Sequence, residues 1–327
     1  MREIIRKRKL APGVKEEMLK ANFWINKLDN PHQILLNEKE KKDFYFKSLK
    51  RAEEKNLEVE YCDLKSYPDS VTADFLQEIM NDYSNPDELY KKTYYDFSGA
   101  EINEQKKRLL EKRSNLYEIK EKIKVKWGII IKRENLRAYP TEDVFAGKPE
   151  AIDQDLLQLT ALSAGTPLAV LHKSLDGKWL FVQSPFYRGW VKKVSVALTD
   201  NRCDVFYFQN ASEFLVVKES RVRTEPNPFL PEISNILFQM GDKIPLLADE
   251  KVPFSFPPEN QQAQSAEGFY CVKIPIRDNN GYLQYKSALM ARSSGLNVGY
   301  LKYNRTNLLK QAFKMLGERY GWGGLYE

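Results

Sequence analysis

Cysteine and histidine are scarce in this chain of 327 residues, which has three cysteines and two histidines. The cysteines lie far apart and form no C-x-x-C motif: Cys62, Cys203 and Cys271. The sequence therefore predicts neither a disulfide framework nor a structural zinc site, and we expect no metal and no cofactor. The two histidines leave few partners for a catalytic dyad. His32 in "NPHQ" is expected in a turn, and His172 in "VLHKSLDG" is expected on the surface, where a strand ends.

Long apolar runs are absent as well. No stretch reaches the roughly 18 consecutive apolar residues that suggest a membrane span. The first segment, "MREIIRKRKLAPGVKEEMLK", has a positive cluster but no apolar stretch after it, which is not typical of a signal peptide. With this start the protein is expected in the cytoplasm, and if an N-terminal signal was lost the expected location is the cell envelope.

Neither sign of charge dominates, since 51 Lys and Arg oppose 45 Asp and Glu. The densest basic stretches, "RKRK" and "KKRLLEKR", lie at a terminus or among acids. They are typical of solvated helix faces and not of a nucleic-acid-binding patch, so no nucleic-acid partner is expected. Attraction to acidic polymers such as teichoic acids stays open, because charge alone identifies no partner.

What the chain does contain is typical of packed globular domains, with 42% hydrophobic and 12% aromatic residues. Its length suggests roughly two or three domains. The first of them, residues 1–122, is expected to be a helical N-terminal clip. Apolar residues recur at i, i+3 and i+4 in "KEEMLKANFWINKL", "TADFLQEIMNDY" and "EINEQKKRLLEKRSNLYEIKEKI", and breakers such as "SNPD" separate these stretches.

Near residue 123 the apolar period changes to two, which favours strands and marks a domain boundary. The strand pattern then occurs twice. "IIKRENLRAYP" from Ile130 matches "VVKESRVRTEP" from Val216, and "GTPLAVL", "DGKWLFV" and "RGWV" match "GDKIPLL", "EGFYCV" and "NGYL". This repetition, with Asp-Gly and Asn-Gly turns, predicts two small β-barrels at residues 123–200 and 201–302.

Two further expectations concern these barrels. Four aromatic residues are expected to fill the barrel cores: Phe181, Phe186, Tyr270 and Tyr282. The polar stretch "ADEKVPFSFPPENQQAQSAEG" in the second barrel is expected to be an inserted surface loop.

A helix is expected in "NLLKQAFKML", with Thr306 as its N-cap and Gly317 as its C′ residue. It carries one apolar stripe, formed by Leu308, Leu309, Ala312, Phe313 and Leu316. Such a stripe needs a partner that buries it. We therefore expect residues 303–327 to begin a domain that this sequence does not complete.

The order of these parts resembles the NlpC-type cell-wall cysteine peptidases with tandem bacterial SH3 barrels, which are γ-D-glutamyl-L-diamino acid endopeptidases. The resemblance is carried by "LRAYPT", "DGKW", "YRGWV" and above all "GERYGWGG". It implies a mixed, multi-domain fold. That fold has the helical clip, two SH3-like β-barrels and the first helix of an incomplete α+β papain-like domain.

In that family "Y-x-W-G-G" precedes a nucleophilic cysteine at a helix N-terminus, and a histidine base follows later. A helix N-terminus and a nearby imidazolium favour the attacking thiolate. No cysteine or histidine of this chain stands at such a position. The resemblance thus implies a peptidase truncated before its nucleophile, which as given does not hydrolyse by the family mechanism. Tyr320 matches the tyrosine that positions the oxyanion, a role that is empty without the cysteine.

Substrate recognition is the function that the resemblance leaves to this chain, with peptidoglycan stem peptides or muropeptides as partners. Tyr187 in "YRGW" is expected to bind substrate, although an exposed hairpin aromatic fits the same pattern. Trp190 is expected beside it as support in the core. Glu142 or Asp143 is the expected partner of the peptide's ammonium group.

Two glycines and two alternatives complete these expectations. Gly323 and Gly324 match glycines that let the backbone approach the site. One alternative is a stand-alone module that binds peptidoglycan without cutting it, and the other is an interaction scaffold that shares the barrels.

Overall fold

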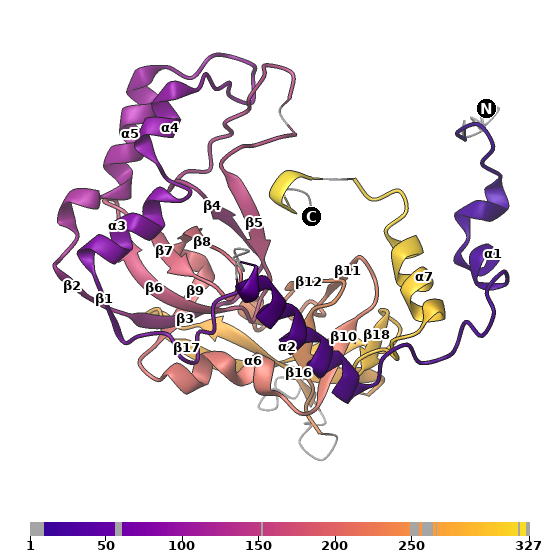
Figure 1. Cartoon of the computed structure of the whole chain (residues 1–327). Coiled ribbons are helices and arrows are strands. Elements are labelled where there is room, and N and C mark those ends of the chain that lie inside the picture. The colour runs from indigo at the N-terminus through magenta and orange to yellow at the C-terminus, as the bar shows by residue number, and fades with distance from the viewer. Residues whose placement is uncertain are drawn as a thin grey trace, which may run out of the picture. The chain divides into compact units, whose positions relative to one another are not determined.

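The structure is a computed structural model, and it describes residues 10–55, 61–151, 153–248, 255–256, 264–265, 267–319 and 321–324. The chain forms two compact units (Figure 1). One comprises residues 1–59 and 300–318, and the other comprises residues 60–299 and 319–327. Within the described ranges no helix is both long and apolar enough to cross a bilayer.

The first unit is helical. It contains the 3₁₀ turn η1 (Glu16–Leu19) and the helices α1 (Ala21–Ile25), α2 (Glu38–Glu54) and α7 (Arg305–Lys314). The predicted cap of α7 at Thr306 is wrong, because the side chain of Asn304 accepts the hydrogen bond from the amide of Asn307. Thr306 is buried instead, and its hydroxyl donates to the carbonyl oxygen of Pro31 at 3.1 Å.

The end of α7 also differs from the prediction. Met315 is the C-cap, so Gly317 lies one residue beyond the C′ position, although it has the expected positive φ of 91°. The apolar stripe is not buried within this unit, since Leu308 and Leu316 are exposed.

The second unit begins with three helices: α3 (Ala73–Asn81), α4 (Pro86–Lys91) and α5 (Glu104–Ser114). The side chains of Thr72, Asn85 and Asn103 accept hydrogen bonds from the first turns of these helices. The prediction that the last helix continues through "NLYEIKEKI" is wrong. Asn115 adopts a φ of +56°, which ends α5. The chain then forms the turn η2 (Leu116–Glu118) and the strand β2 (Lys122–Lys124), which pairs with β1 (Ser70–Thr72).

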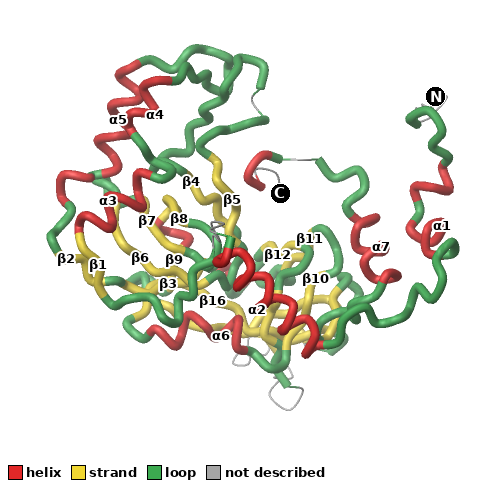
Figure 2. Tube along the Cα trace, in the orientation of Figure 1, coloured by secondary structure: helices red, strands yellow, loops and turns green. Residues whose placement is uncertain are grey.

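A seven-stranded antiparallel sheet follows in the order β5-β4-β8-β7-β6-β3-β9. Figure 2 shows these strands with α3, α4 and α5 beside them. The strands are β3 (Lys126–Ile130), β4 (Glu134–Arg137), β5 (Gln158–Leu162), β6 (Pro167–Lys173), β7 (Trp179–Gln183), β8 (Arg188–Lys192) and β9 (Val196–Thr199). Lys124 and Lys126 are exposed, whereas Val125 and Trp127 are buried, as the alternation in the sequence predicts.

The second strand region repeats the pairing of the first. β10 (Phe214–Val217) pairs with β13 (Lys243–Pro245) and β18 (Leu296–Val298), as β3 pairs with β6 and β9. Two further pairs correspond to β4–β5 and β7–β8, namely β11 (Arg221–Arg223) with β12 (Leu237–Gln239) and β16 (Phe269–Arg277) with β17 (Leu283–Ala291). The strands here form several small sheets, so a second SH3-like barrel stays a prediction.

The connections around this region are short turns and one short helix. They are η3 (Lys193–Ser195), η4 (Arg202–Phe206), α6 (Tyr207–Asn210) and η5 (Pro231–Ile233). Most of the predicted inserted loop lies outside the described residues. Its middle contains two described strands, β14 (Ser255–Phe256) and β15 (Gln264–Ser265), which pair with each other.

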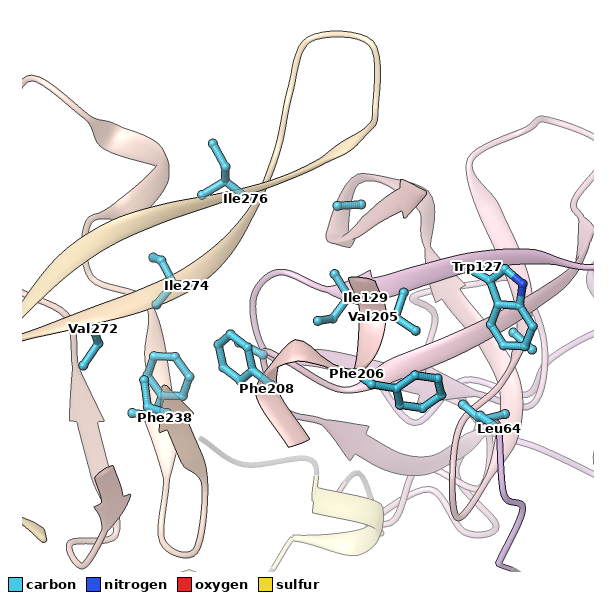
Figure 3. Close-up of a cluster of buried hydrophobic side chains, with 14 of the residues drawn as sticks. Leu64, Trp127, Ile129, Val205, Phe206, Phe208, Phe238, Val272, Ile274 and Ile276 are labelled. Atoms are coloured by element: carbon cyan, nitrogen blue, oxygen red, sulfur yellow. The ribbon is translucent and has the colours of Figure 1, made fainter. Parts of the chain in front are cut away.

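One hydrophobic cluster joins the seven-stranded sheet to the second strand region (Figure 3). Ile129 of β3, Phe208 of α6 and Phe238 of β12 belong to it and are almost fully buried. Phe181 also lies in this core as predicted, and Tyr270 is half-buried.

The core prediction is wrong for two hairpin aromatics. Phe186 is 61% exposed and Tyr282 is 50% exposed. Both lie beside tight turns and outside the core clusters, and the ring centroid of Phe186 lies 5.7 Å from that of Tyr61.

Candidate functional site

The segment Trp322–Gly324 (η7) packs against β5 of the seven-stranded sheet (Figure 1). Two side chains of that sheet region hold its backbone. The amide Nε2 of Gln158 donates to the carbonyl oxygen of Gly323 at 3.1 Å. The guanidinium of Arg133 donates to the carbonyl oxygen of Gly324. The backbone of residues 323–324 is thereby fixed to the seven-stranded sheet region.

Glycine is required at both of these positions. Gly323 has a φ of +55°, and a Cβ there would lie 2.6 Å from the carbonyl oxygen of Gln158. Gly324 has a φ of +71°, and its Cβ would lie 3.3 Å from the Cβ of Ala161. Positive φ and close backbone approach both disfavour a side chain. The close approach that the two glycines permit here is to the strand β5.

A buried arginine, Arg137, holds the residues of the sheet region that lie at this contact. Arg137 and Asp155 form an ion pair and are 4% and 1% exposed. Arg137 also donates to Oε1 of Gln158 at 3.1 Å, and to the carbonyl oxygens of Thr141 and Asp143 at 3.1 and 2.7 Å. One side chain therefore connects the loop at 141–143 to the glutamine that holds Gly323.

The two predicted ammonium partners lie in this loop. Both Glu142 and Asp143 are exposed. Glu142 forms an ion pair with Lys192 of β8, and a carboxylate oxygen of Asp143 lies 3.4 Å from Nζ of Lys106. A cationic ligand would have to compete with these lysines. Exposed pairs are weak, so such competition costs little.

Tyr187 lies at the start of β8, in a tight turn. Its backbone carbonyl accepts a hydrogen bond from the hydroxyl of Ser184 at 2.7 Å, and its amide donates back to that hydroxyl oxygen at 3.0 Å. The half-buried ring packs against the hydrophobic cluster that contains Val182 and Val191. One face of Tyr187 thus packs on the core, and the residue as a whole is half-buried.

Trp190 is fully buried, so it supports the core and does not line the surface beside Tyr187. Its ring centroid lies 5.5 Å from that of Phe181 and 6.1 Å from that of His172. This place in the core is the one expected for Trp190 as a support of Tyr187.

Residues 84–110 pack against the residues on either side of the loop at 141–143. Phe145 is fully buried in a cluster with Tyr94 of this segment, and their ring centroids are 5.5 Å apart. The hydroxyl of Ser84 donates to the carbonyl oxygen of Ala138. Sequence reasoning singled out none of Arg133, Asp155 and Gln158. For Arg137 it had one signal, the match of "LRAYP" to the second repeat.

Among the hydrogen bonds of the described residues, none joins a cysteine to a histidine. Burial raises the pKa of the Cys62 thiol, and it raises that of Cys271 to about 11, which disfavours both thiolates. Nε2 of His172 lies 3.1 Å from the carbonyl oxygen of Asn115, and Nδ1 of His32 lies 3.2 Å from the hydroxyl of Thr306.

The surroundings of the histidines test two expectations. His32 lies in a turn as predicted. The prediction that His172 is a surface residue is wrong, because it is half-buried and burial lowers its pKa.

Tyr320 lies outside the described residues. Within them, no group of three or more His, Cys, Asp or Glu side chains could hold a metal ion.

Comparison with known proteins adds a family match. Residues 145–192 match the family described as SH3 domain (SH3b1 type). The chain carries an SH3-like domain of the SH3b1 type. This match lies inside the seven-stranded sheet region and includes Phe145, Asp155, Gln158 and Tyr187. No curated protein matches the chain.

A solved structure resembles much more of the chain. It is that of an NlpC/P60 endopeptidase from Photobacterium damselae subsp. piscicida, with 18% sequence identity and a TM-score of 0.60. The similarity covers 80% of this chain and 55% of that one. The SH3b1-type domain therefore stands within a fold shared with an endopeptidase, of which the chain spans about half the length.

Proposed function

We propose that this chain is the peptide-recognition portion of a peptidoglycan peptide hydrolase, whose intact form cleaves the bond between γ-D-glutamate and a diamino acid. The observation that carries the proposal is the attachment of Gly323 and Gly324 to the seven-stranded sheet region, through Gln158 of the SH3b1-type match and through Arg133. The segment that resembles the approach to a peptidase nucleophile is thus held in a fixed place beside the barrel.

The buried Arg137 gives this attachment a consequence for recognition. Because Arg137 holds both Gln158 and the loop at 141–143, one side chain connects the loop that carries the two acids to the residue that holds Gly323. In the proposed hydrolase these acids bind the ammonium group of a stem peptide, and Tyr187 contacts the same end of the peptide. A buried, fully connected polar network keeps such a site preorganised.

The exposed stripe of α7 has a place in the same proposal. Leu308 and Leu316 face solvent within their unit. In the hydrolase they pack into the peptidase domain that α7 begins.

The alternative function is a stand-alone module that binds peptidoglycan without cutting it. The SH3b1-type match at residues 145–192 favours it, because the domain is present whether or not a catalytic domain is. The scaffold alternative offers no reason for the two glycines that pack on β5.

Binding to purified cell walls tests both proposals together. The chain is mixed with insoluble peptidoglycan at low and moderate salt, and retention is measured for the native chain and for a double variant, E142Q with D143N. Both proposals predict retention by the native chain. Only the recognition proposal predicts that soluble muropeptides with a free amino terminus compete better than acetylated ones, and that the double variant loses this preference. Absence of retention even at low salt, where charge attraction is strongest, contradicts both proposals.

A further inference from the structure

A groove of about 530 Å³ in the second unit is lined by six lysines, and we call it the lysine groove. Its walls come from the segment 115–126, which contains η2 and β2, and from residues of β6, β7, η3 and β9. Five of the lysines are exposed and the last is half-buried: Lys120, Lys122, Lys124, Lys126, Lys173 and Lys193. Positive charge is thus gathered in one hollow of the surface.

This charge is not neutralised within the described part of the chain. None of the six lysines forms an ion pair there, whereas the neighbouring Lys192 pairs with Glu142. The acid in the groove lining, Glu118, accepts a hydrogen bond from Nδ2 of Asn115 at 2.9 Å. Even when Glu118 is ionised, six positive charges face one negative charge. Like charges that are held close together repel each other, so an anion in the groove is stabilised.

Three of the lysines form a row. Lys122 and Lys124 are two residues apart in β2, so their side chains lie on one side of the strand, about 6.6 Å apart. Lys126 follows after two further residues, at the start of β3, and Val125 between them is buried. A row of separate charges matches a partner whose negative charges repeat along a chain better than it matches a single small anion.

The types of side chain in the lysine groove narrow the chemistry of that partner. Among the described residues that line it, none is Arg, Phe, Tyr or Trp, and the apolar ones are aliphatic, such as Ile123, Val170 and Leu198. Arginine forks suit planar carboxylates, and aromatic rings stack on nucleic-acid bases, whereas lysine binds phosphate as a point charge. A hollow also fits a flexible chain better than the flat surface of a bilayer.

We propose that the lysine groove binds a linear phosphodiester polymer with a saturated carbon backbone. The row of Lys122, Lys124 and Lys126 contacts successive phosphates, and the aliphatic residues contact the carbon backbone between them. This binding gives a place in the fold to the attraction to acidic polymers that the overall charge leaves open.

The proposal does not depend on the hydrolase function. Glu142, Asp143 and Tyr187, which the recognition of a stem peptide uses, are not among the residues that line the lysine groove. Polymer binding and muropeptide binding can therefore be lost separately, by substitutions at different sites.

Titration of the full chain with three phosphate-bearing probes tests the proposal. The probes are lipid-free poly(glycerol phosphate), single-stranded oligothymidylate with the same number of phosphates, and vesicles of phosphatidylcholine and phosphatidylglycerol. Calorimetry gives the dissociation constant of each, per phosphate, at constant ionic strength. We expect saturable binding of poly(glycerol phosphate), about tenfold or more tighter than that of the other two, which weakens as salt is raised. Absence of this binding, or equal or tighter binding of another probe, overturns the proposal.

Substitutions then locate the site. The double variant K122Q with K124Q removes two exposed charges of the row and is expected to raise the dissociation constant for poly(glycerol phosphate) about tenfold or more. The control K91Q with K92Q removes the same two charges from exposed positions at the end of α4, outside the groove, and is expected to leave it unchanged.

A further variant, K173Q on β6, keeps the test informative if the first double variant does not fold, because Lys173 is exposed and lies on another strand. It is expected to weaken polymer binding several-fold. Equal affinities of the native chain and the groove variants, or equal weakening by the control, overturn the proposal.

Discussion

The side-chain amide of Gln158 and the carbonyl oxygen of Gly323 are 165 residues apart in the sequence and 3.1 Å apart in space. This hydrogen bond joins the SH3b1-type domain to the segment that most resembles a cell-wall peptidase. The arrangement of the candidate site depends on it, because Gln158 is itself positioned by Arg137.

Replacement of Gly323 by alanine is expected to detach the segment 322–324 from β5. The new Cβ would lie 2.6 Å from the carbonyl oxygen of Gln158, and φ is +55°. Such a conformation costs about 1–3 kcal/mol for a residue other than glycine. Amide hydrogen exchange of residues 321–324 is expected to rise.

Gly177→Ala is the matched control for that substitution. Gly177 has a φ of +67° but open space at its Cβ position, so it carries the backbone strain without the steric contact. Equal exchange at residues 321–324 in native and G323A chains would show that the contact does not hold the segment.

Replacement of Arg137 by methionine is expected to destabilise the second unit by about 3–5 kcal/mol, because it leaves Asp155 charged and buried. Denaturant unfolding measures this loss. Lys92→Met removes the same charge from an exposed pair with Glu88 and is expected to cost below about 1 kcal/mol. A similar small effect for both variants would mean that the Arg137 network contributes no special stability.

Replacement of Tyr187 by phenylalanine tests recognition without loss of the ring that packs on the core. We expect a several-fold weaker binding of muropeptides with a free amino terminus, and thermal melts measure any accompanying change in stability. Tyr282→Phe removes a comparable hydroxyl from the second strand region, where Tyr282 is 50% exposed, and is expected to leave muropeptide binding unchanged. Unchanged muropeptide affinity in Y187F would remove Tyr187 from the site.

Acid is expected to destabilise the fold partly through His172. Burial lowers the pKa of His172 below its usual value near 6.5, so the unfolded chain binds this proton more readily. Stability therefore falls as the pH drops from about 6.5 towards the folded pKa, and the loss is complete below it. Thermal melts from pH 7 to 5 are expected to fall less steeply in H172Q. Parallel curves for the two proteins would rule out His172 as the source.

Local features of the fold were predictable from the sequence. Alternation in "KIKVKW" predicts that Val125 and Trp127 point inward and the lysines outward, and the structure confirms it. Helix capping was less certain, because both Asn304 and Thr306 are good N-caps in isolation. Only the contact of Thr306 with Pro31 decides between them, and that contact is not visible in the local sequence.

The polar network of the candidate site could not be predicted in the same way. Arg137, Asp155 and Gln158 have no distinctive local pattern, and their hydrogen bonds arise only when β4 and β5 pair. The exposed Phe186 and Tyr282 were misassigned because alternation describes a strand and not the turn beside it.

The most direct test of the proposed function uses the natural protein, purified from its own cells and incubated with muropeptides. Mass spectrometry then gives the mass of the intact protein and identifies the products. The account predicts cleavage between γ-D-glutamate and the diamino acid, with weaker cleavage when the peptide's amino terminus is acetylated. If the muropeptides stay intact in the presence of the folded natural protein, the proposed hydrolase function is contradicted.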